Sequence, residues 1–222
     1  MEQVIQGSPE WHMLRLGKVT ASRVADILRK GKGGAISMSR ARYMGELAAE
    51  RLTGQPTVGF KSSDMEWGNT TEPLACDAYA FYRDADLTEV AFVTHATIGE
   101  CGASPDRLVG ADGLVEIKCP ATHTHIATLL GAPIDTDYLT QMHWQMACTG
   151  RAWCDWVSFD PRMPEALRLH VQRVPRDAAR IADIETEVIA FLTELRETVD
   201  KLRNKYGMAE PDTEAVRLRR AG

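Results

Sequence analysis

Two carboxylates and one ammonium stand close together in the middle of the sequence. Asp106 follows Ser104-Pro105, Glu116 comes ten residues later, and Lys118 follows two positions after Glu116. The intervening residues hold an Asp-Gly pair between short apolar runs, which is typical of a β-hairpin. A hairpin sets its strands side by side, so Asp106 and Glu116 can meet, and strand alternation puts Glu116 and Lys118 on one face. Such an arrangement can hold a divalent cation and activate a water beside a phosphate.

The oxygen ligands in this pattern favour Mg²⁺, with Mn²⁺ as an alternative. Mg²⁺ prefers octahedral oxygen ligands and keeps waters when only one or two carboxylates bind it. Asp106 and Glu116 supply that minimum, and the backbone carbonyl of Ile117 can add a third protein oxygen. Glu72, on an expected helix before the hairpin, is a candidate outer ligand or base. Lys118 should stay protonated beside two carboxylates, so we expect it to position water and stabilise developing negative charge.

A surface ladder of ion pairs is the alternative explanation of these three charged residues. Their spacing alone does not distinguish a ladder from a metal site. Pro105 directly before Asp106 sharpens the metal interpretation. The apolar residues Leu114, Val115 and Ile117 around the charges favour a buried strand over an exposed one.

Charge is distributed unevenly along the chain. The net charge of −5 over 222 residues at first argues against a nucleic-acid partner. However, eight Lys/Arg and one Asp lie between Arg15 and Arg42, whereas 15 acidic and five basic residues lie between Tyr43 and Gly150. A nuclease needs this combination, with cations for phosphates and carboxylates for metal. A solvated basic helix face is the alternative explanation of the basic segment.

Bulk composition predicts a cytoplasmic protein without a membrane span. The chain is 44% apolar and 26% charged, and no apolar run approaches the ~18 residues that a membrane helix needs. The first six residues lack the basic and apolar regions of a signal peptide. Five cysteines without a C-x-x-C pair predict buried free thiols in a reducing compartment.

The elements around the hairpin predict a mixed α/β (α+β) fold. Helices are expected at residues 20–30, 39–52 with Ser39 as N-cap, 67–82, 122–130, 137–149 and 177–206, and a flexible loop at 31–34. Strands are expected at residues 90–97, in the hairpin, at 153–159 and at 167–174. Helices before and after mid-chain strands predict a central mixed β-sheet flanked by helices, and the antiparallel hairpins argue against a doubly wound parallel sheet.

The length suits a single domain spanning residues 1–222. We expect a core at residues 11–174, a long C-terminal helix at 177–206 and a frayed tail from 207 to 222. The long helix carries one apolar stripe, formed by Ile181, Ile184, Val188, Phe191, Leu195 and Leu202. Packing on the parent domain is the favoured use of that stripe, and a subunit contact is the alternative.

Taken in order, the motifs of this chain resemble those of the PD-(D/E)xK nuclease superfamily. The closer resemblance is to the lambda-type phage exonucleases of the YqaJ-like viral recombinase family. It rests on six motifs that span most of the chain: Trp11-His12-Met13-Leu14-Arg15-Leu16-Gly17, Thr20-Ala21-Ser22, Trp67-Gly68-x₃-Glu72, Ser104-Pro105-Asp106 with Glu116-Ile117-Lys118-Cys119-Pro120, Tyr138-Leu139-Thr140-Gln141, and Phe159-Asp160-Pro161-Arg162-Met163. Each is weak alone, but six in this order are a specific signal. The resemblance implies a restriction-endonuclease-like nuclease core.

The resemblance also implies an activity. Family members are processive 5′→3′ exonucleases that degrade one strand of double-stranded DNA, from 5′-phosphorylated ends, to mononucleotides. The resemblance places metal at Asp106, Glu116 and the Ile117 carbonyl, with Lys118 at the attacking water. It draws a 5′-phosphate pocket from Arg15, Ser22, Ser104 and Gln141. A guanidinium and hydroxyls suit a terminal phosphate, and Ser22 near a helix N-terminus adds dipole support.

Partners are implied by the resemblance alone. The family assembles as a ring-shaped homotrimer with DNA passing through the ring, which would keep an acidic protein bound to its DNA substrate. Its members work with a single-strand annealing protein in recombination, and a phage- or prophage-encoded protein would act in the bacterial cytoplasm.

Two other functions are compatible with the same residues. A structure-specific endonuclease or repair nuclease of the superfamily would cut closed circular DNA, which an end-dependent enzyme leaves intact. A non-catalytic DNA-end-binding recombination scaffold would release no nucleotides, although the intact Asp106, Glu116 and Lys118 speak against it. The sequence departs from the superfamily pattern at His143 and Trp144, where a tyrosine is common, and we expect Trp144 in the core. Zinc at His123 and His125 and an iron–sulfur cluster are not expected, because matching Cys/His spacing is absent.

Overall fold

Two β-sheets form the centre of the computed structural model, which describes residues 4–57 and 62–208. The larger sheet has the strand order β2-β5-β6-β7-β8, and the smaller has β1-β4-β3. The strands are β1 (Val19–Thr20), β2 (Leu87–Thr88), β3 (Val93–Thr94), β4 (Cys101–Ala103), β5 (Arg107–Val109), β6 (Gly113–Lys118), β7 (Trp153–Phe159) and β8 (Leu169–Pro175). The larger sheet is mixed, because β6 and β7 run parallel while its other neighbouring strands are antiparallel.

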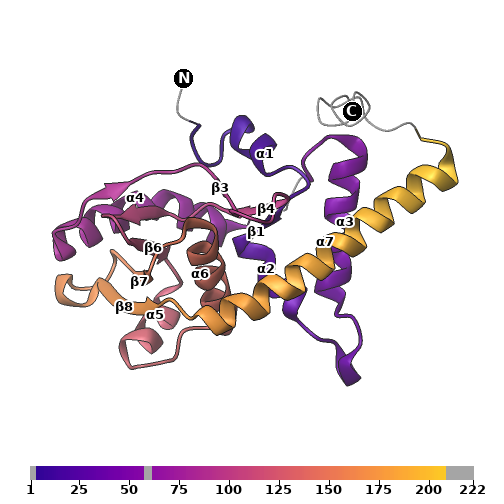
Figure 1. Cartoon of the computed structure of the whole chain (residues 1–222). Helices are drawn as coiled ribbons and strands as arrows, with labels where there is room; N and C mark the ends of the chain where they lie inside the picture. Colours follow the sequence, from indigo (N-terminus) through magenta and orange to yellow (C-terminus); the bar gives the residue numbers. More distant parts are fainter. Residues whose placement is uncertain (1–3, 58–61, 209–222) are drawn as a thin grey trace.

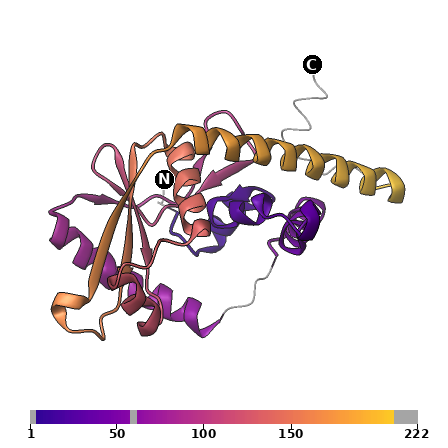
Figure 2. The same cartoon turned by 90° about the horizontal axis from the view of Figure 1, so that it is seen from below.

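Helices cover both faces of the larger sheet. They are α1 (Pro9–Arg15), α2 (Val24–Leu28), α3 (Met38–Thr53), α4 (Ser63–Arg83), α5 (Thr122–Leu129), α6 (Thr136–Thr149) and α7 (Ala178–Tyr206), with short 3₁₀ turns η1 (Ala21–Arg23), η2 (Lys32–Gly34) and η3 (Glu165–Leu167). Figure 1 shows α7 running obliquely across the molecule. Seen from below, α4 lies on one side of the strands and α6 and α7 lie on the other (Figure 2). The mixed α/β fold expected from the sequence is confirmed.

Strand alternation divides the core into two parts. Leu114 of β6 and Trp156 of β7 pack with α2, α3, α6 and α7. Val115, Ile117 and Val157 point to the opposite face, where they pack with Tyr79 and its neighbours on α4. Burial of both faces makes β6 an interior strand. Glu116 therefore enters the protein from the face that carries Leu114.

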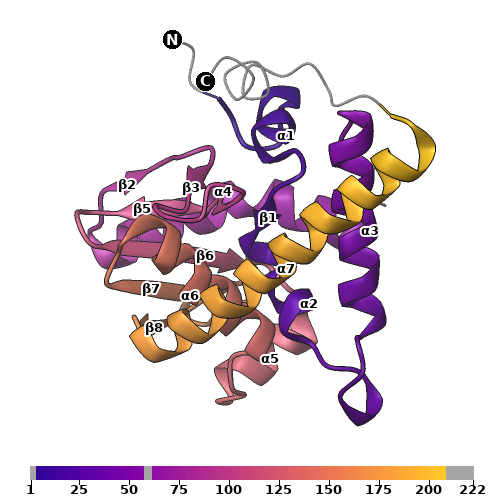
Figure 3. The ribbon, with the colours of Figure 1, turned by 45° about the vertical axis from the view of Figure 1, so that its right-hand side comes forward.

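The long C-terminal helix is held on its own domain. Asp177 caps its N-terminus by accepting from the Arg180 amide, and Gly207 ends it with φ of 64°. The apolar stripe from Ile181 to Leu195 is buried, whereas Leu202 is half-buried. Figure 3 shows α7 crossing α2 and α3. Packing on the parent domain, the favoured use of the stripe, is therefore confirmed.

Several local predictions need correction. The N-cap of α3 is Ser37, whose hydroxyl accepts from the Arg40 amide, because Ser39 is already inside the helix. The helix expected at 20–30 is a 3₁₀ turn followed by the short α2. The strand expected at 90–97 is reduced to β3, because His95 Nδ1 accepts from the amides of Thr97 and Ile98 and turns the chain. The loop at 31–34 contains the turn η2.

Two expectations about the whole chain also have outcomes. All five cysteines are free thiols; four are buried and Cys119 is half-buried. Within residues 4–57 and 62–208, no helix has the length and apolar character to cross a membrane. The tail predicted from residue 207 onward falls, from 209, outside the described residues.

Candidate active site

The β5–β6 hairpin brings the two predicted carboxylates together. Arg107 of β5 lies opposite Val115 of β6, so Asp106, one residue before β5, comes beside Glu116. The left-handed backbone of Gly110, with φ of 49°, allows the turn between the strands. Asp106 Oδ2 accepts from the Ile117 amide at 2.6 Å. This bond fixes the Asp106 side chain to the strand that carries Glu116.

Glu116 is held by three donors deep inside the protein. Its side chain is 1% exposed. Oε1 accepts from Lys118 Nζ at 2.5 Å and from Gln141 Nε2 at 2.6 Å, and Oε2 accepts from Gln145 Nε2 at 2.6 Å. Lys118 shares the face of Glu116 because of strand alternation, and its Nζ lies 4.9 Å from the ring centroid of Tyr138.

Two carboxyl groups near Lys118, those of Asp106 and Glu72, have raised pKa values. Burial raises the pKa of Asp106 well above its usual value, and the charges of Glu116 and Glu72 raise it further. Burial also raises the pKa of Glu72, although Arg107, whose Nη1 lies 3.7 Å from Glu72 Oε1, opposes this effect. Burial lowers the pKa of Lys118, but Glu116 and Asp106 outweigh it and the net shift is upward. Lys118 therefore keeps its proton, and the carboxylates outnumber the ammonium.

A divalent cation fits this set of residues. In the described part of the chain, no group of three or more His, Cys, Asp or Glu side chains is arranged to enclose a metal. Mg²⁺ does not need such a group, because it keeps several waters beside one or two carboxylates. Asp106 and Glu116, with the Ile117 carbonyl, form an oxygen set of that kind. The upward pKa shift of Asp106 is the observation that supports the fit, since a bound cation would offset both burial and like-charge repulsion.

His125 is engaged elsewhere. Its side chain is fully buried on α5, with Nδ1 at 2.7 Å from Ser158 Oγ and Nε2 at 2.8 Å from the Leu167 carbonyl. Both ring nitrogens therefore already have protein partners, and this histidine serves the packing of α5 on the sheet.

A second region, lined by both cations and carboxylates, lies beside the carboxylate cluster. It is a cavity of about 800 Å³ between α1, α3 and α4. Arg15 and Ser22 line it on one side and Glu72 and Arg107 on the other. Glu72 thus connects the cavity with the carboxylate cluster.

Arg15 is a cation of this cavity that forms no ion pair with a described carboxylate. Its guanidinium stacks on the Trp11 ring at 3.7 Å, and burial lowers its pKa to about 10. Among the described residues no carboxylate forms an ion pair with Arg15. Glu50, which favours its charge from a distance, instead accepts from the amides of Gly17 and Thr57. A half-buried guanidinium without a carboxylate partner is suited to receive an anionic ligand.

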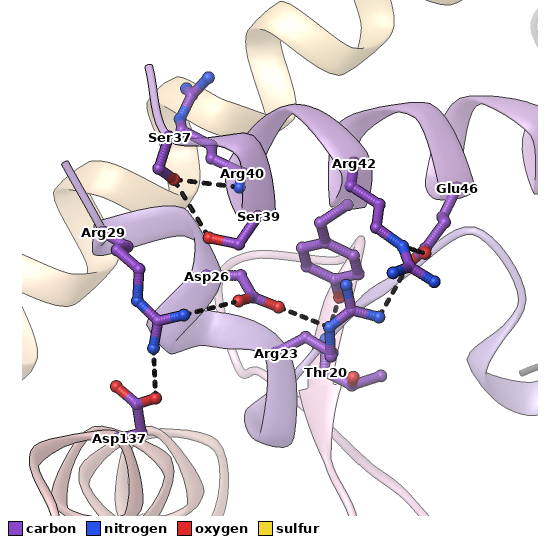
Figure 4. A network of polar contacts seen from close by, with 11 residues as sticks. Thr20, Arg23, Asp26, Arg29, Ser37, Ser39, Arg40, Arg42, Glu46 and Asp137 are labelled. Atoms are coloured by element: carbon purple, nitrogen blue, oxygen red, sulfur yellow. Dashed lines mark hydrogen bonds and ion pairs between the residues drawn. The ribbon is translucent and has the colours of Figure 1, made fainter. Parts of the chain in front are cut away.

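Other arginines of the basic segment are paired within the protein. Arg23 bonds Asp26 at 2.7 Å and Glu46 at 2.8 Å, and Arg42 bonds Glu46 at 2.8 Å (Figure 4). Arg29 pairs with Asp137 at the start of α6 in the same network. These charges hold α2, α3 and α6 together. The contrast with Arg15 shows that the basic segment contains both structural cations and an unpaired one.

The structure brings some of the predicted site residues together and separates others. Asp106, Glu116, Ile117 and Lys118 form one cluster. Gln141, predicted at the phosphate pocket, contacts Glu116 in this cluster. Arg15 and Ser22 line the cavity, whereas Ser104 accepts from Trp11 Nε1 at 3.0 Å and donates to the Ala91 carbonyl at 2.6 Å.

Three contributors to the site were not predicted from the sequence. Trp11 supports the Arg15 guanidinium, Gln145 holds Glu116, and Arg107 neutralises part of the charge of Glu72. A four-residue spacing on a helix, as in Trp11-x₃-Arg15 and Gln141-x₃-Gln145, was the available signal, because it places both side chains on one face.

Comparison with known proteins identifies a family. Residues 10–152 match the YqaJ-like viral recombinase domain. The alkaline exonuclease LHK-Exo from Laribacter hongkongensis is 47% identical, with 90% of this chain and 98% of that chain covered, and a TM-score of 0.83. The structure of LHK-Exo in complex with dAMP gives the same identity and coverage, with a TM-score of 0.84.

A more distant structure shares the fold. A phage-related exonuclease from Haemophilus somnus 129PT has a TM-score of 0.63 at 16% identity, with 83% of this chain and 96% of that chain covered. No curated protein matches the chain. The domain match and the identity to LHK-Exo agree, and this chain belongs to the YqaJ-like viral recombinase family.

Proposed function

We propose that this chain is a metal-dependent 5′→3′ exonuclease that degrades one strand of double-stranded DNA, processively and to mononucleotides, from 5′-phosphorylated ends. The observation that carries the proposal is the junction of two sites: the cluster of Asp106, Glu116 and Lys118, and the adjoining cavity that contains the unpaired Arg15. LHK-Exo supports it, because it is described as an alkaline exonuclease and binds dAMP, which has the chemistry of a mononucleotide product.

The carboxylate cluster supports hydrolysis of a phosphodiester. Asp106, Glu116 and the Ile117 carbonyl would hold Mg²⁺, or alternatively Mn²⁺, which when bound would acidify water and neutralise charge on the phosphate. Lys118 keeps its proton beside Glu116, so it stabilises negative charge that develops on the attacked phosphate. Glu72 lies at the edge of the cavity with a raised pKa, which suits an acceptor for the proton of the attacking water.

The Arg15 cavity supports the choice of a 5′ end. A terminal phosphate carries more negative charge than an internal one, and Arg15 offers a guanidinium that no described carboxylate neutralises. Ser22 adds a hydroxyl on the same wall. Gln141 and Ser104 complete the proposed pocket. Gln141 lies beside Glu116, to which it donates, and Ser104 accepts from Trp11, the residue on which Arg15 stacks. A 5′-phosphate held here would place the adjoining linkage toward the carboxylates, which gives the 5′→3′ direction.

The proposal extends to the partners. A homotrimeric ring around DNA would explain processivity in a chain whose net charge is −5. A single-strand annealing protein would receive the strand that remains, and the setting would be the cytoplasm of a bacterial host that carries the phage or prophage. Family membership supports these partners.

A time course on end-labelled DNA tests the activity. Linear duplex labelled at either the 5′ or the 3′ ends is incubated with Mg²⁺ or with EDTA, beside a closed circular duplex. We expect early release of the 5′ label as mononucleotide in Mg²⁺ only, with the circle intact. Cutting of the circle would favour a structure-specific endonuclease, and the absence of any released nucleotide would favour a non-catalytic DNA-end-binding scaffold.

A further inference from the structure

Two amide side chains of helix α6, one helical turn apart, donate hydrogen bonds to Glu116. Gln141 donates to Oε1 and Gln145 donates to Oε2, each at 2.6 Å. Gln145 is fully buried, unlike Gln141, which is half-buried. Gln145 does not line the cavity that contains Arg15 and has no exposed surface, so a direct contact with DNA does not account for it.

The orientation of the Gln145 amide lowers the stability of the folded state. A carboxylate only accepts hydrogen bonds, so the amide must turn its NH₂ toward Glu116. Its Oε1 atom is then buried and, among the described residues, has no hydrogen-bond partner. An unpaired buried carbonyl is destabilising, and an apolar side chain of similar volume would avoid it. The donor that reaches Glu116 is the feature that distinguishes Gln145 from such a side chain.

We infer that Gln145 is a positioning residue that holds the Glu116 carboxylate in the orientation needed for the divalent cation. The inference rests on the proposed function. Groups that hydrogen-bond a metal-ligating carboxylate fix its direction, and loss of such a group typically lowers metal affinity or activity about 10- to 100-fold. Oε2 has Gln145 as its donor, whereas Oε1 has both Gln141 and Lys118. Loss of Gln145 would therefore free one side of the carboxylate.

Direct measurement of metal binding tests the inference without reference to activity. Mn²⁺ is titrated calorimetrically into the full chain, without DNA, for the wild type, Gln145→Met and Asp106→Asn. Methionine keeps the volume of glutamine but has no donor. We expect Gln145→Met to weaken Mn²⁺ binding roughly 10- to 100-fold and to lower kcat, with little change in KM for DNA. The matched control is Met146→Leu, a volume-conserving change at a fully buried position of α6, which should leave Mn²⁺ affinity unchanged.

A second variant and a double-mutant cycle keep the inference falsifiable. If Gln145→Met does not fold, as judged by circular dichroism, Gln145→Asn replaces it, because the shorter amide no longer reaches Glu116. In a Glu116→Gln background, loss of Gln145 should weaken Mn²⁺ binding much less than in the wild type. If the Gln145 variant binds Mn²⁺ with wild-type affinity while Asp106→Asn loses Mn²⁺ binding, the inference about Gln145 is overturned and the proposed function is not. Failure of the wild type to bind Mn²⁺ would overturn the proposed function.

Discussion

The carboxylate cluster and the Arg15 cavity differ in the charge that lacks a partner: negative at Asp106 in the cluster, positive at Arg15 in the cavity. In the cluster, Asp106, Glu116 and Glu72 surround one ammonium, and the pKa of Asp106 is raised. In the cavity, the Arg15 guanidinium stacks on the Trp11 ring, has no carboxylate partner in the described part of the chain, and has a pKa lowered by burial to about 10. Each region is destabilised by charge that its neighbours do not balance. A bound cation would stabilise the carboxylate cluster, and a bound anion would stabilise Arg15. Under the proposed function, Mg²⁺ is that cation and the phosphate of a DNA end is that anion.

The paired network on α2 and α3 shows how the chain treats charges that are only structural. Arg23, Asp26 and Glu46 neutralise one another within bonding distance. Arg15, in contrast, has no carboxylate partner among residues 4–57 and 62–208, and Asp106 is buried beside two further carboxylates. This contrast makes the two regions functional candidates, because uncompensated buried charge is rarely retained for stability.

The largest expected effect comes from removing a charge from the cluster. Asp106→Asn should lower the rate of nucleotide release by roughly 10³-fold or more, since a bound cation contributes several kcal/mol to transition-state stabilisation. The free energy of unfolding should not fall, because the variant removes a repulsive buried charge. Single-turnover kinetics and urea unfolding measure the two quantities. Wild-type rates in this variant would break the assignment of the cluster.

Loss of the ammonium in the cluster should affect chemistry more than binding. Lys118→Met should slow the single-turnover rate by roughly 10²- to 10³-fold, as expected for one preorganised charge at the attacked phosphate. DNA affinity, measured by fluorescence anisotropy, should change little. The control is Lys201→Met, an exposed lysine of α7 that lies 3.6 Å from Glu197. A change confined to affinity would assign Lys118 to DNA binding instead.

Arg15→Ala tests the cavity, as the two preceding variants test the cluster. The ratio of rates on 5′-phosphorylated and 5′-hydroxyl ends should fall roughly 10- to 100-fold, because a charge-assisted hydrogen bond contributes about 1.5–3 kcal/mol. The rate on 5′-hydroxyl ends should be nearly unaffected. Arg196→Ala, which removes a cation that pairs with Glu100 away from the cavity, serves as the control. An unchanged ratio would remove Arg15 from the phosphate pocket.

The smallest expected effect concerns a charge that is fully paired. Asp160 bonds Arg162 at 2.7 Å, and these bonds lower the pKa of Asp160 to about 2. Since the unfolded value is higher, near 4, the stabilisation is present above about pH 4 and is lost as pH falls toward 2. Asp160→Asn should lower the free energy of unfolding by about 1–2 kcal/mol at pH 7, with a smaller difference at pH 3.

Activity serves as the readout that separates this pair from the cluster. Asp160→Asn should leave the rate per folded molecule at pH 7 unchanged. A fall in that rate as large as the one expected for Asp106→Asn would show that paired and unpaired charges are not functionally distinct in this chain.

Sequence-local signals predicted the parts of the fold that depend on neighbours in the chain. The Asp112-Gly113 pair predicted the hairpin, but the expected tight turn at that pair was wrong, because the chain turns at residues 110–112 and Gly113 is already the first residue of β6. Strand alternation predicted β7 at 153–159 with the bounds that the structure has. The division into two sheets was not predictable in this way. It depends on the parallel pairing of Val19 with Cys101, which are far apart in the sequence.

The same limit applies to the candidate site. The types and spacing of Asp106, Glu116 and Lys118 were sufficient to predict their meeting, because one hairpin joins them. The contact of Gln145 with Glu116 bridges a helix and a strand, and the bond of Trp11 to Ser104 joins residues 93 positions apart. Such contacts follow from tertiary packing, which periodicity does not encode.

The most direct test of the central claim is single-turnover release of the 5′ nucleotide from a 5′-phosphorylated linear duplex, measured with Mg²⁺ and with EDTA. Rapid release in Mg²⁺ and none in EDTA is the predicted result. Release at the same rate in EDTA, or release from the 3′ end first, would contradict the pairing of a cation site with a 5′-phosphate site.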